Sequence, residues 1–223
     1  MLMTALEIIW EYRVAFGQGL LVTLQMSAII WLLGIGLGTL LGWYAAGHTS
    51  SVGRTIRVVA FVLSGVPTIV FLFWLHYPAQ AMAGVVIDPF YTAVLTFVIL
   101  NIIGVSDIVR GALEDFPKHY AVAARVCGMS ERQTFRYIQL PLLLRGIIPG
   151  LLMLQITMLH TTLFASLISV EEVFRVAQRI NAMIYKPVEI YTALGIFFLC
   201  ISLPVNGLAI YLKNRFTRDV SER

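Results

Sequence analysis

The stretch VAARVCGMSERQTFRYIQLP, residues 122–141, is the longest polar segment in a chain that is otherwise almost wholly apolar. Gly128, near its middle, is expected to break or bend a helix, because it has no side chain to restrict the backbone. Pro141 restricts the residue before it and is expected to close a helix at Leu140. Charged residues occur among the helix formers, at Arg125, Glu131, Arg132 and Arg136. The stretch therefore predicts two short helices joined by a glycine turn, a hairpin that suits docking to a soluble partner.

The composition around this hairpin is that of an integral membrane protein. Of 223 residues, 59% are hydrophobic and only 13% are charged, against about 25% charged residues in soluble domains. Because one spanning helix takes about 20 apolar residues, the length allows roughly five spans and one polar excursion. No Lys/Arg-rich run interleaved with aromatic residues occurs, so nucleic-acid binding has no support. The predicted fold is one all-α transmembrane domain over residues 1–223.

Apolar stretches place the five expected spans and the segments between them. The spans cover residues 19–47, 58–77, 90–110, 146–170 and 190–212. A short interfacial helix is expected over 1–15, a polar turn over 48–57, a loop over 78–89, the polar hairpin region over 112–145 and an amphipathic surface helix over 171–189. The N-terminus carries glutamates rather than a basic region, so no removable signal peptide is expected.

The sidedness of the chain follows from its Lys and Arg residues. With five spans, twelve of the sixteen fall on one side, in the 48–57 turn, residues 110–145 and the C-terminal tail. The other four fall on the opposite side. Cytoplasmic loops carry the excess of Lys and Arg. The N-terminus is therefore expected outside, and the hairpin and the C-terminus are expected in the cytoplasm.

Small residues recur at helical spacing in the first span. Gly34, Gly38 and Gly42 form two overlapping GxxxG patterns. Such glycines let two helices approach closely within a membrane. Packing inside the chain and contact with another subunit both use this pattern, and packing inside the chain is favoured.

The second span is interrupted by Ser64-Gly65-Val66-Pro67-Thr68. Glycine and proline in mid-span free backbone groups that lipid cannot satisfy, so a lined cavity or an internal partner is needed. Broken helices of this kind are typical of transporter substrate sites, and a packing kink is the structural alternative. Ser64, Gly65, Pro67 and Thr68 are therefore candidate residues of a substrate path.

Polar groups within the other spans are candidates for the same path. Asn101 and Asp107 lie in the third span, and His160 and Thr161 lie in the fourth. Ionisable groups at this depth are costly and by default functional. Two structural alternatives stay open: Arg110 can pair with Asp107 on one helix face, and a lone histidine often bonds a neighbouring helix.

The opening stretch resembles the signature of permease subunits of binding-protein-dependent ABC importers, which is Glu-Ala-Ala, three residues, glycine, nine residues and Ile-x-Leu-Pro. Val122 stands where that family usually has glutamate, and the remaining residues agree in type and spacing. The resemblance implies that residues 112–145 are a cytoplasmic coupling segment, which docks on an ATPase subunit. The residues that carry this expectation are Ala123, Ala124, Arg125, Gly128, Ile138, Leu140 and Pro141.

A wider resemblance, over residues 17–215, is to the polar amino acid branch, which carries histidine, glutamine, arginine or opines. It rests on Asn101 and on the runs Asp107-Ile108-Val109-Arg110-Gly111, Leu159-His160-Thr161-Thr162 and Arg175-Val176-Ala177-Gln178. The branch commonly has arginine, threonine, glutamine and tyrosine at the positions of Ser64, Val66, Phe71 and Gly104. The resemblance implies the ABC type I importer permease fold. The departures favour a heteromeric pair, in which a different permease chain supplies most ligand contacts.

The implied assembly is an ATP-driven importer for polar or basic amino acids or opines in a bacterial inner membrane. In it, two ATPase subunits bind ATP and Mg²⁺, and a periplasmic or lipid-anchored binding protein delivers the substrate. No Walker P-loop or hydrolase motif occurs in the sequence, so no catalytic site, metal or cofactor is expected on this chain. The alternatives are an ion-gradient-driven secondary transporter and a structural membrane subunit.

Overall fold

The computed structural model describes the backbone of residues 2–47 and 51–221 and the side chains of residues 5–47 and 54–215. Every regular element in this part of the chain is a helix, which confirms the expected fold class. In chain order the elements are α1 (Leu2–Glu11), α2 (Arg13–Gly47), α3 (Ser51–Ser64), α4 (Thr68–His76), α5 (Pro78–Ala83), α6 (Pro89–Glu114), α7 (Lys118–Val126), α8 (Glu131–Thr134), the π-helical turn η1 (Phe135–Gln139), α9 (Leu140–Thr161), the 3-10 helix η2 (Thr162–Ile168), α10 (Val173–Ile184) and α11 (Pro187–Ser221).

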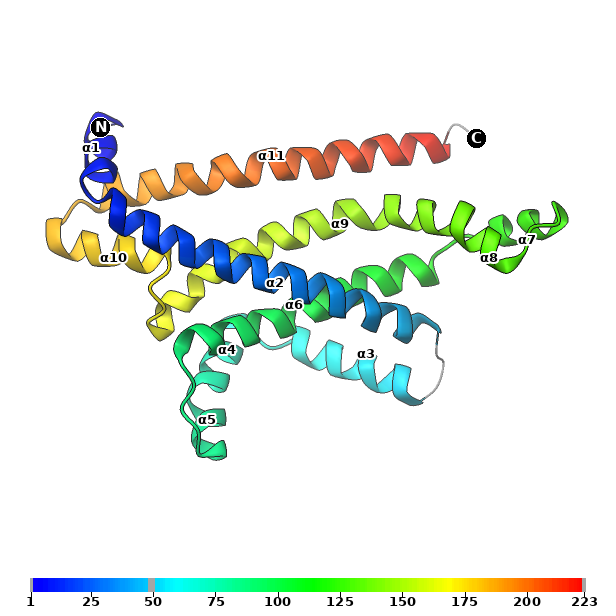
Figure 1. The fold of residues 1–223 in the computed structure, drawn as a ribbon, viewed down its shortest axis with the longest axis horizontal. Coiled ribbons are helices and arrows are strands. Elements are labelled where there is room, and N and C mark those ends of the chain that lie inside the picture. Colours follow the sequence, from blue (N-terminus) through cyan, green and yellow to red (C-terminus); the bar gives the residue numbers. More distant parts are fainter. Residues whose placement is uncertain (1, 48–50, 222–223) are drawn as a thin grey trace.

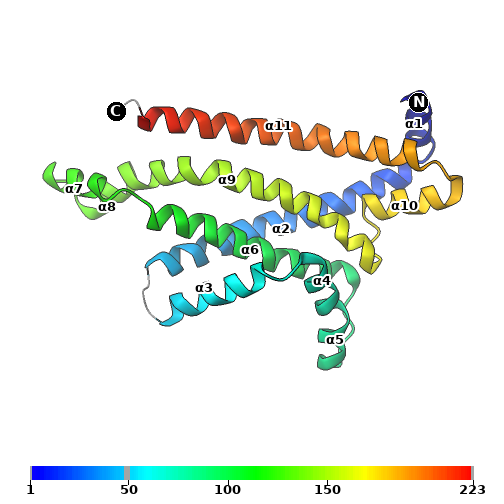
Figure 2. The same cartoon turned by 180° about the vertical axis from the view of Figure 1, so that it is seen from behind.

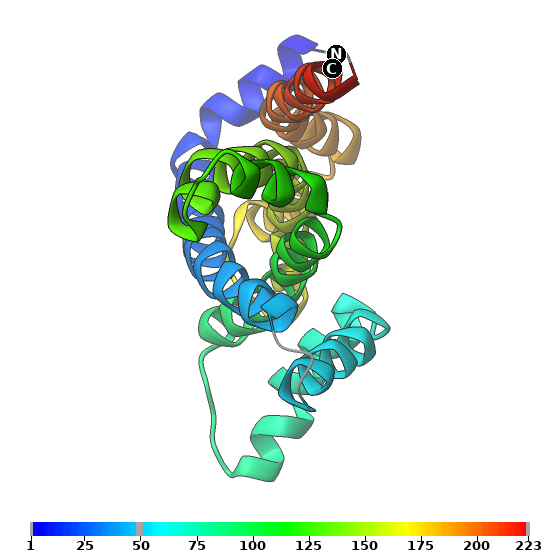
Figure 3. The ribbon, with the colours of Figure 1, turned by 90° about the vertical axis from the view of Figure 1, so that its right-hand side faces the viewer.

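The long helices α2, α6, α9 and α11 run lengthwise and form the body of the molecule (Figure 1). The hairpin α7–α8 lies at one end of this body, and α1 and α10 lie at the opposite end (Figures 1 and 2). Figure 3, a view from the hairpin end, shows that α3, α4 and α5 lie beside the body. The hairpin and the α1–α10 end are therefore separated by the full length of the spans.

Four helical stretches are long and apolar enough to cross a membrane: Arg13–Gly47, Pro89–Glu114, Glu131–Ile168 and Pro187–Arg215. A further pair, Arg54–Ser64 and Thr68–Ala83, passes the same test but bends by 98° at the break. Counted as one span, the pair brings the described part of the chain to the expected five. The interruption expected at Ser64–Thr68 is present, because Pro67 adopts an extended ψ of 132° between α3 and α4.

Several element bounds differ from those expected. The first span begins at Arg13 rather than near residue 19, and α3 begins at Ser51, within the expected 48–57 turn. Residues 48–50 of that turn lie outside the described part of the chain. Helix α5 occupies six residues of the expected 78–89 loop, and α6 and α11 extend past their expected ends at 110 and 212. Helix α10 confirms the expected surface helix, because its apolar face is buried and its opposite face is exposed.

The helix does not close at Leu140, contrary to expectation, because Glu131–Ile168 is one helical stretch that runs through Pro141. A π-helical turn, Phe135–Gln139, precedes the proline, and the Leu140 N–H donates to the Phe135 carbonyl oxygen. Proline lacks an N–H and its ring clashes with the preceding turn of a regular helix, so the wider π turn accommodates it. The fourth span therefore starts at α9, before the expected residue 146, and continues directly from the hairpin.

The glycine stripe of α2 packs on α6 inside the chain. A Cβ at Gly38 would lie 2.6 Å from the Val105 Cβ, and one at Gly42 would lie 2.6 Å from the Ser106 carbonyl oxygen. A Cβ at Gly34 would overlap the side chain of Asn101. All three glycines are buried. The close approach of α2 and α6 confirms that this pattern serves packing within the chain.

Candidate functional site

A buried pair of amides joins three of the long helices. Asn101 of α6 and Gln155 of α9 exchange two hydrogen bonds, from Asn101 Nδ2 to Gln155 Oε1 at 2.9 Å and from Gln155 Nε2 to Asn101 Oδ1 at 3.1 Å. Asn101 also donates to the Ile30 carbonyl oxygen of α2 at 2.9 Å, and Trp31 donates to the Gln155 carbonyl oxygen at 3.1 Å. Asn101 is fully buried. In this structure, Asn101 therefore fixes α2, α6 and α9 relative to one another.

The break in the second span exposes backbone beside the bundle. The Ser64 hydroxyl donates to the Phe61 carbonyl oxygen at 2.8 Å, within its own helix. Helix α4 then begins after Pro67, and within the described residues no side-chain cap satisfies its first N–H groups. Ser64, Gly65 and Pro67 are exposed, and Thr68 is half-buried. The break thus presents a helix N-terminus that favours a negatively charged ligand group.

Asp107 lies on the exposed side of α6 in an ion-pair network. Its carboxylate accepts from Arg110 at 3.1 Å, and Arg110 also donates to Glu114 at 2.8 Å. The pairing that the sequence left open is therefore present. Because two carboxylates share one guanidinium, the three side chains carry one net negative charge.

His160 and Thr161 are bonded within the helical bundle. His160 Nε2 lies 2.8 Å from the Ser202 hydroxyl of α11, and the Thr161 hydroxyl donates to the Thr157 carbonyl oxygen at 2.8 Å. The candidate path residues therefore do not form one hydrogen-bonded cluster in the described part of the chain. Among the described residues, no group of three His, Cys, Asp or Glu side chains is placed to hold a metal ion.

The hairpin presents an exposed face at the far end of the spans. Helix α7 ends in a turn at Gly128, which has φ of +74°, and the Met129 N–H donates to the Ala124 carbonyl oxygen at 3.0 Å. Ser130 and Gln133 then form a reciprocal capping box that starts α8. Ala124 is buried. The predicted hairpin is thus confirmed, and left-handed backbone at Gly128 sets its turn.

The two faces of the hairpin differ in what they contact. Trp43, near the end of α2, packs edge-on against Phe135 at a ring-centroid distance of 5.2 Å. Helix α7 exposes Val122 and Val126 by 60% and 83%. Ala123 and Arg125 are also exposed. Three residues further along are half-buried: Ile138 in η1, and Leu140 and Pro141 at the start of α9. The first four residues can therefore contact a partner, while the last three join the hairpin to the span.

Glu172 is a buried carboxylate that the sequence did not single out. It lies between the span Glu131–Ile168 and α10, and its two oxygens accept the N–H groups of Phe174 and Arg175, each at 2.8 Å. The Val173 N–H donates to Thr23 of α2 at 3.2 Å. Glu172 therefore caps α10 where this helix meets α2. A signal was present, since an acidic residue directly precedes the amphipathic run, where it can satisfy free helix N–H groups.

Burial raises the pKa of Glu172 to about 7, although its two backbone hydrogen bonds act in the opposite direction. Between pH 4.5 and 7 the folded protein thus binds a proton that the unfolded chain releases, and the stability contributed by this group falls as the pH rises.

The free energy of unfolding of the wild type, relative to that of Glu172→Gln, is expected to increase by up to roughly 3 kcal/mol when the pH falls from 8 to 4.5. Thermal unfolding of both proteins across this range measures the difference. Glu7→Gln, at an exposed position of α1, is the control and should show the pH dependence of the wild type.

The chain matches the family of binding-protein-dependent transport system inner membrane components over residues 38–218. It is 29% identical over 208 residues to the glutamine transport system permease protein GlnP of Escherichia coli K12, with 93% of this chain and 95% of the relative covered. It is 26% identical to the histidine/lysine/arginine/ornithine transport system permease protein HisQ of Salmonella typhimurium, with 91% of this chain and 93% of the relative covered. It is also 25% identical to the octopine transport system permease protein OccM of Rhizobium radiobacter, with 96% and 95% covered.

Two solved structures share the fold. A chain of an amino acid ABC transporter crystallised with histidines superimposes with a TM-score of 0.75 at 24% identity, covering 93% of this chain and 96% of that one. A chain of the inward-facing MetNI methionine ABC transporter superimposes with a TM-score of 0.73 at 16% identity, covering 92% and 98%. The helical arrangement is therefore that of chains of these two ABC transporters.

Proposed function

Because the chain belongs to the family of binding-protein-dependent transport system inner membrane components, we propose that it is the membrane-spanning subunit of an ATP-driven importer for polar or basic amino acids or opines. The family makes the chain a multi-pass integral membrane component of a transport system. The amino acid class is supported by relatives whose names give glutamine, histidine, lysine, arginine, ornithine and octopine. In this proposal the chain forms half of the translocation path and hydrolyses nothing itself.

The observation that carries this proposal is the hairpin at one end of the spans. Its exposed face combines the apolar Val122 and Val126 with the cationic Arg125, a combination that can enter a groove on a soluble ATPase subunit. Helices α8 and α9 belong to one helical stretch, so movement of the docked hairpin moves the fourth span with it. Two such ATPase subunits, which bind ATP and Mg²⁺, supply the energy.

The hairpin end is assigned to the cytoplasm on the Lys/Arg count, which also places the N-terminus outside. The α1–α10 end then faces the periplasm and offers the exposed face of α10 to a periplasmic or lipid-anchored binding protein. The break before α4 lies beside the body between the two ends (Figure 1). Its uncapped N-terminus suits the carboxylate of an amino acid, which supports Ser64, Gly65, Pro67 and Thr68 as path residues.

The second half of the path is assigned to a different permease chain. Helices α3 and α4 expose large apolar side chains beside the body, including Phe61 and Trp74 at 80% and 49%, and a second permease can cover them. Ser64 and Val66 offer little hydrogen bonding to a substrate at the break, so the partner would supply most ligand contacts. A heteromeric pair therefore suits this chain better than two identical copies.

Reconstitution tests the proposed function. The chain, purified with its co-eluting subunits, is placed in proteoliposomes and supplied with the binding protein and radiolabelled glutamine or arginine. We expect uptake that requires both ATP and the binding protein, and a second permease among the co-eluting chains. Uptake driven by an ion gradient without ATP would show a secondary transporter, and a complex with two identical permeases would refute the heteromeric pair.

The Asp107 carboxylate is expected to favour cationic substrates, because the network around Arg110 keeps a net negative charge. Asp107→Asn should therefore lower arginine uptake more than glutamine uptake, by about fivefold if one exposed charge contact of about 1 kcal/mol is lost. Asp115→Asn, which removes an exposed carboxylate at the end of α6 outside this network, is the matched control and should leave the ratio unchanged. Equal losses for both amino acids would reject contact between Asp107 and the substrate.

A further inference from the structure

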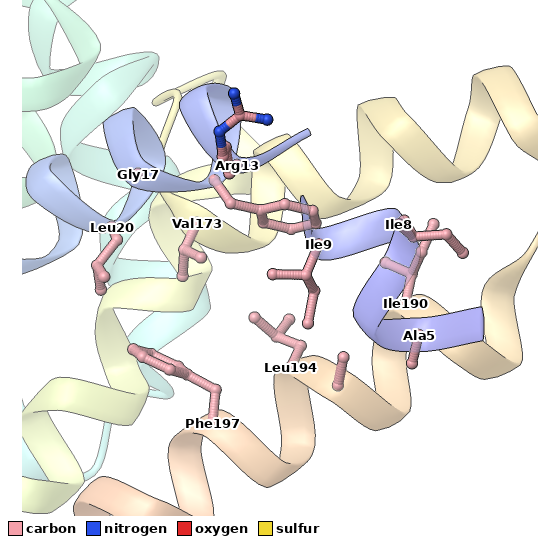
Figure 4. A pocket seen from close by; sticks show the side chains of 12 residues that line it. Ala5, Ile8, Ile9, Arg13, Gly17, Leu20, Val173, Ile190, Leu194 and Phe197 are labelled. Atoms are coloured by element: carbon pink, nitrogen blue, oxygen red, sulfur yellow. The ribbon is translucent and has the colours of Figure 1, made fainter. Parts of the chain in front are cut away.

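An apolar cavity opens where α1 crosses the start of α11, at the end of the molecule away from the hairpin. It encloses about 280 Å³ and is walled by α1, α2, α10 and α11. Ile9, Leu20, Val173, Leu194 and Phe197 line it from these four helices (Figure 4). The volume is slightly below the roughly 300 Å³ at which pockets for drug-sized ligands begin. A slender apolar chain therefore fits this cavity better than a bulky or polar solute.

Arg13 is the one charged residue among those that line this cavity, all of which the structure describes. It lies at the rim (Figure 4) and is the first residue of the apolar helix α2, a position that suits the boundary between headgroups and hydrocarbon. Its guanidinium lies over the ring of Trp10, at 4.9 Å from the ring centre, and donates to the Trp10 carbonyl oxygen at 2.9 Å. Trp10 is 71% exposed, as expected of an aromatic side chain at headgroup level.

Most donors of Arg13 have no partner among the residues that the structure describes. A guanidinium carries five N–H groups, and that of Arg13 donates one hydrogen bond, to the Trp10 carbonyl oxygen. No ion pair joins Arg13 to a carboxylate within the described residues. The planar fork of an arginine matches the oxygens of a phosphate. The cavity and the guanidinium together thus offer an apolar slot with an anion-binding group at its mouth.

We propose that this cavity binds one acyl chain of an anionic phospholipid, whose phosphate pairs with Arg13. Lipid is the occupant that combines an apolar chain with an anionic phosphate at the depth of Trp10 and Arg13. Contacts with the apolar walls of the cavity retain the acyl chain of any phospholipid, and the headgroup contact selects the anionic lipid. The bound lipid fills the space between α1 and α11 and so stabilises the contact of α1 with the bundle.

Native mass spectrometry of the full chain with its co-purified subunits tests the proposal, with phosphatidylglycerol and phosphatidylcholine of identical acyl chains as probes. We expect one retained phosphatidylglycerol per copy of this chain and a preference for it of about fivefold, the factor for one basic contact at a membrane surface. Arg13→Gln should abolish the preference. Ala193→Trp, which fills the cavity from α11, should lower retention of both lipids at least about tenfold, because no apolar slot remains.

Matched variants separate this site from general lipid adhesion. Lys186→Gln removes an exposed charge at the same end of the molecule, and Ala182→Trp adds an indole to the exposed side of α10; both should bind like the wild type. Ala5→Phe fills the cavity from α1 and replaces Ala193→Trp if that variant does not fold. The proposal is overturned if the filled variants retain lipid as the wild type does, if Arg13→Gln keeps the preference, or if the controls lose lipid equally. Absence of lipid from the wild-type complex would also overturn it and would point to a subunit helix as the occupant.

Discussion

Replacement of Gly128 by proline is expected to reduce ATP-driven uptake by about a hundredfold or more. Gly128 has φ of +74° at the hairpin turn, whereas proline fixes φ near −65° and removes the N–H that donates to Arg125 at 2.9 Å. A conflict of about 3 kcal/mol lowers the population of the native turn by roughly a hundredfold. The hairpin then loses the geometry in which α7 and α8 lie together, and ATP hydrolysis is uncoupled from transport.

Two measurements isolate this effect from a failure to assemble. The variant complex is purified and its subunits are quantified, and the stimulation of ATP hydrolysis by the loaded binding protein is then measured. Gly128→Asn is the matched control, because asparagine tolerates left-handed backbone, and it should keep most of the uptake. Normal stimulation of hydrolysis in an assembled Gly128→Pro complex would contradict a coupling role for the turn.

Gly38→Val is expected to be among the most destabilising single changes in the spans. The new Cβ would lie 2.6 Å from the Val105 Cβ and 2.8 Å from the Ile102 carbonyl oxygen, so backbone as well as side chain must move. Overpacking of this kind costs about 1–3 kcal/mol, which corresponds to a fall in the unfolding midpoint of roughly 3–10 °C for a chain of this length. Thermal unfolding of the purified protein in detergent measures this fall.

Gly36→Val is the control for the same change in the same helix. Nothing lies within 4 Å of a Cβ built at Gly36, so this variant should unfold within about 1 °C of the wild type. Equal losses at both positions would show that glycine is required along α2 for a reason other than its packing on α6.

The features that the sequence predicted well depend on local patterns. Apolar runs indicated the membrane class, the spacing of Gly34, Gly38 and Gly42 indicated close helix packing, and Gly65-Val66-Pro67 indicated a broken span. In each case the residues that determine the structure are neighbours in the chain or lie on one helix face. The 98° bend itself could not be predicted, because it depends on how α4 packs on α6. Gln80 of α5 also donates to Thr92 of α6 at 3.0 Å.

The contacts that the sequence missed join residues far apart in the chain. Asn101 was predicted to lie in the substrate path, but its partner Gln155 is 54 residues away, and their meeting depends on the rotation of α6 and α9. Glu172 follows a span, a position typical of an exposed charge, and only the packing of α10 on α2 buries it. The rule that proline closes a helix failed at Pro141 because a π turn, which has no clear sequence signal, relieves the clash.

The unbroken helix from α8 through η1 and α9 to η2 makes the fourth span a lever arm. Its 38 residues correspond to a length of roughly 57 Å. A tilt of about 5° at the hairpin therefore displaces the far end by about 5 Å, close to one helical turn. That far end adjoins Glu172 and α10. A small rotation at the hairpin end is therefore converted, without any intervening loop, into a large displacement at the end of the molecule where α10 lies.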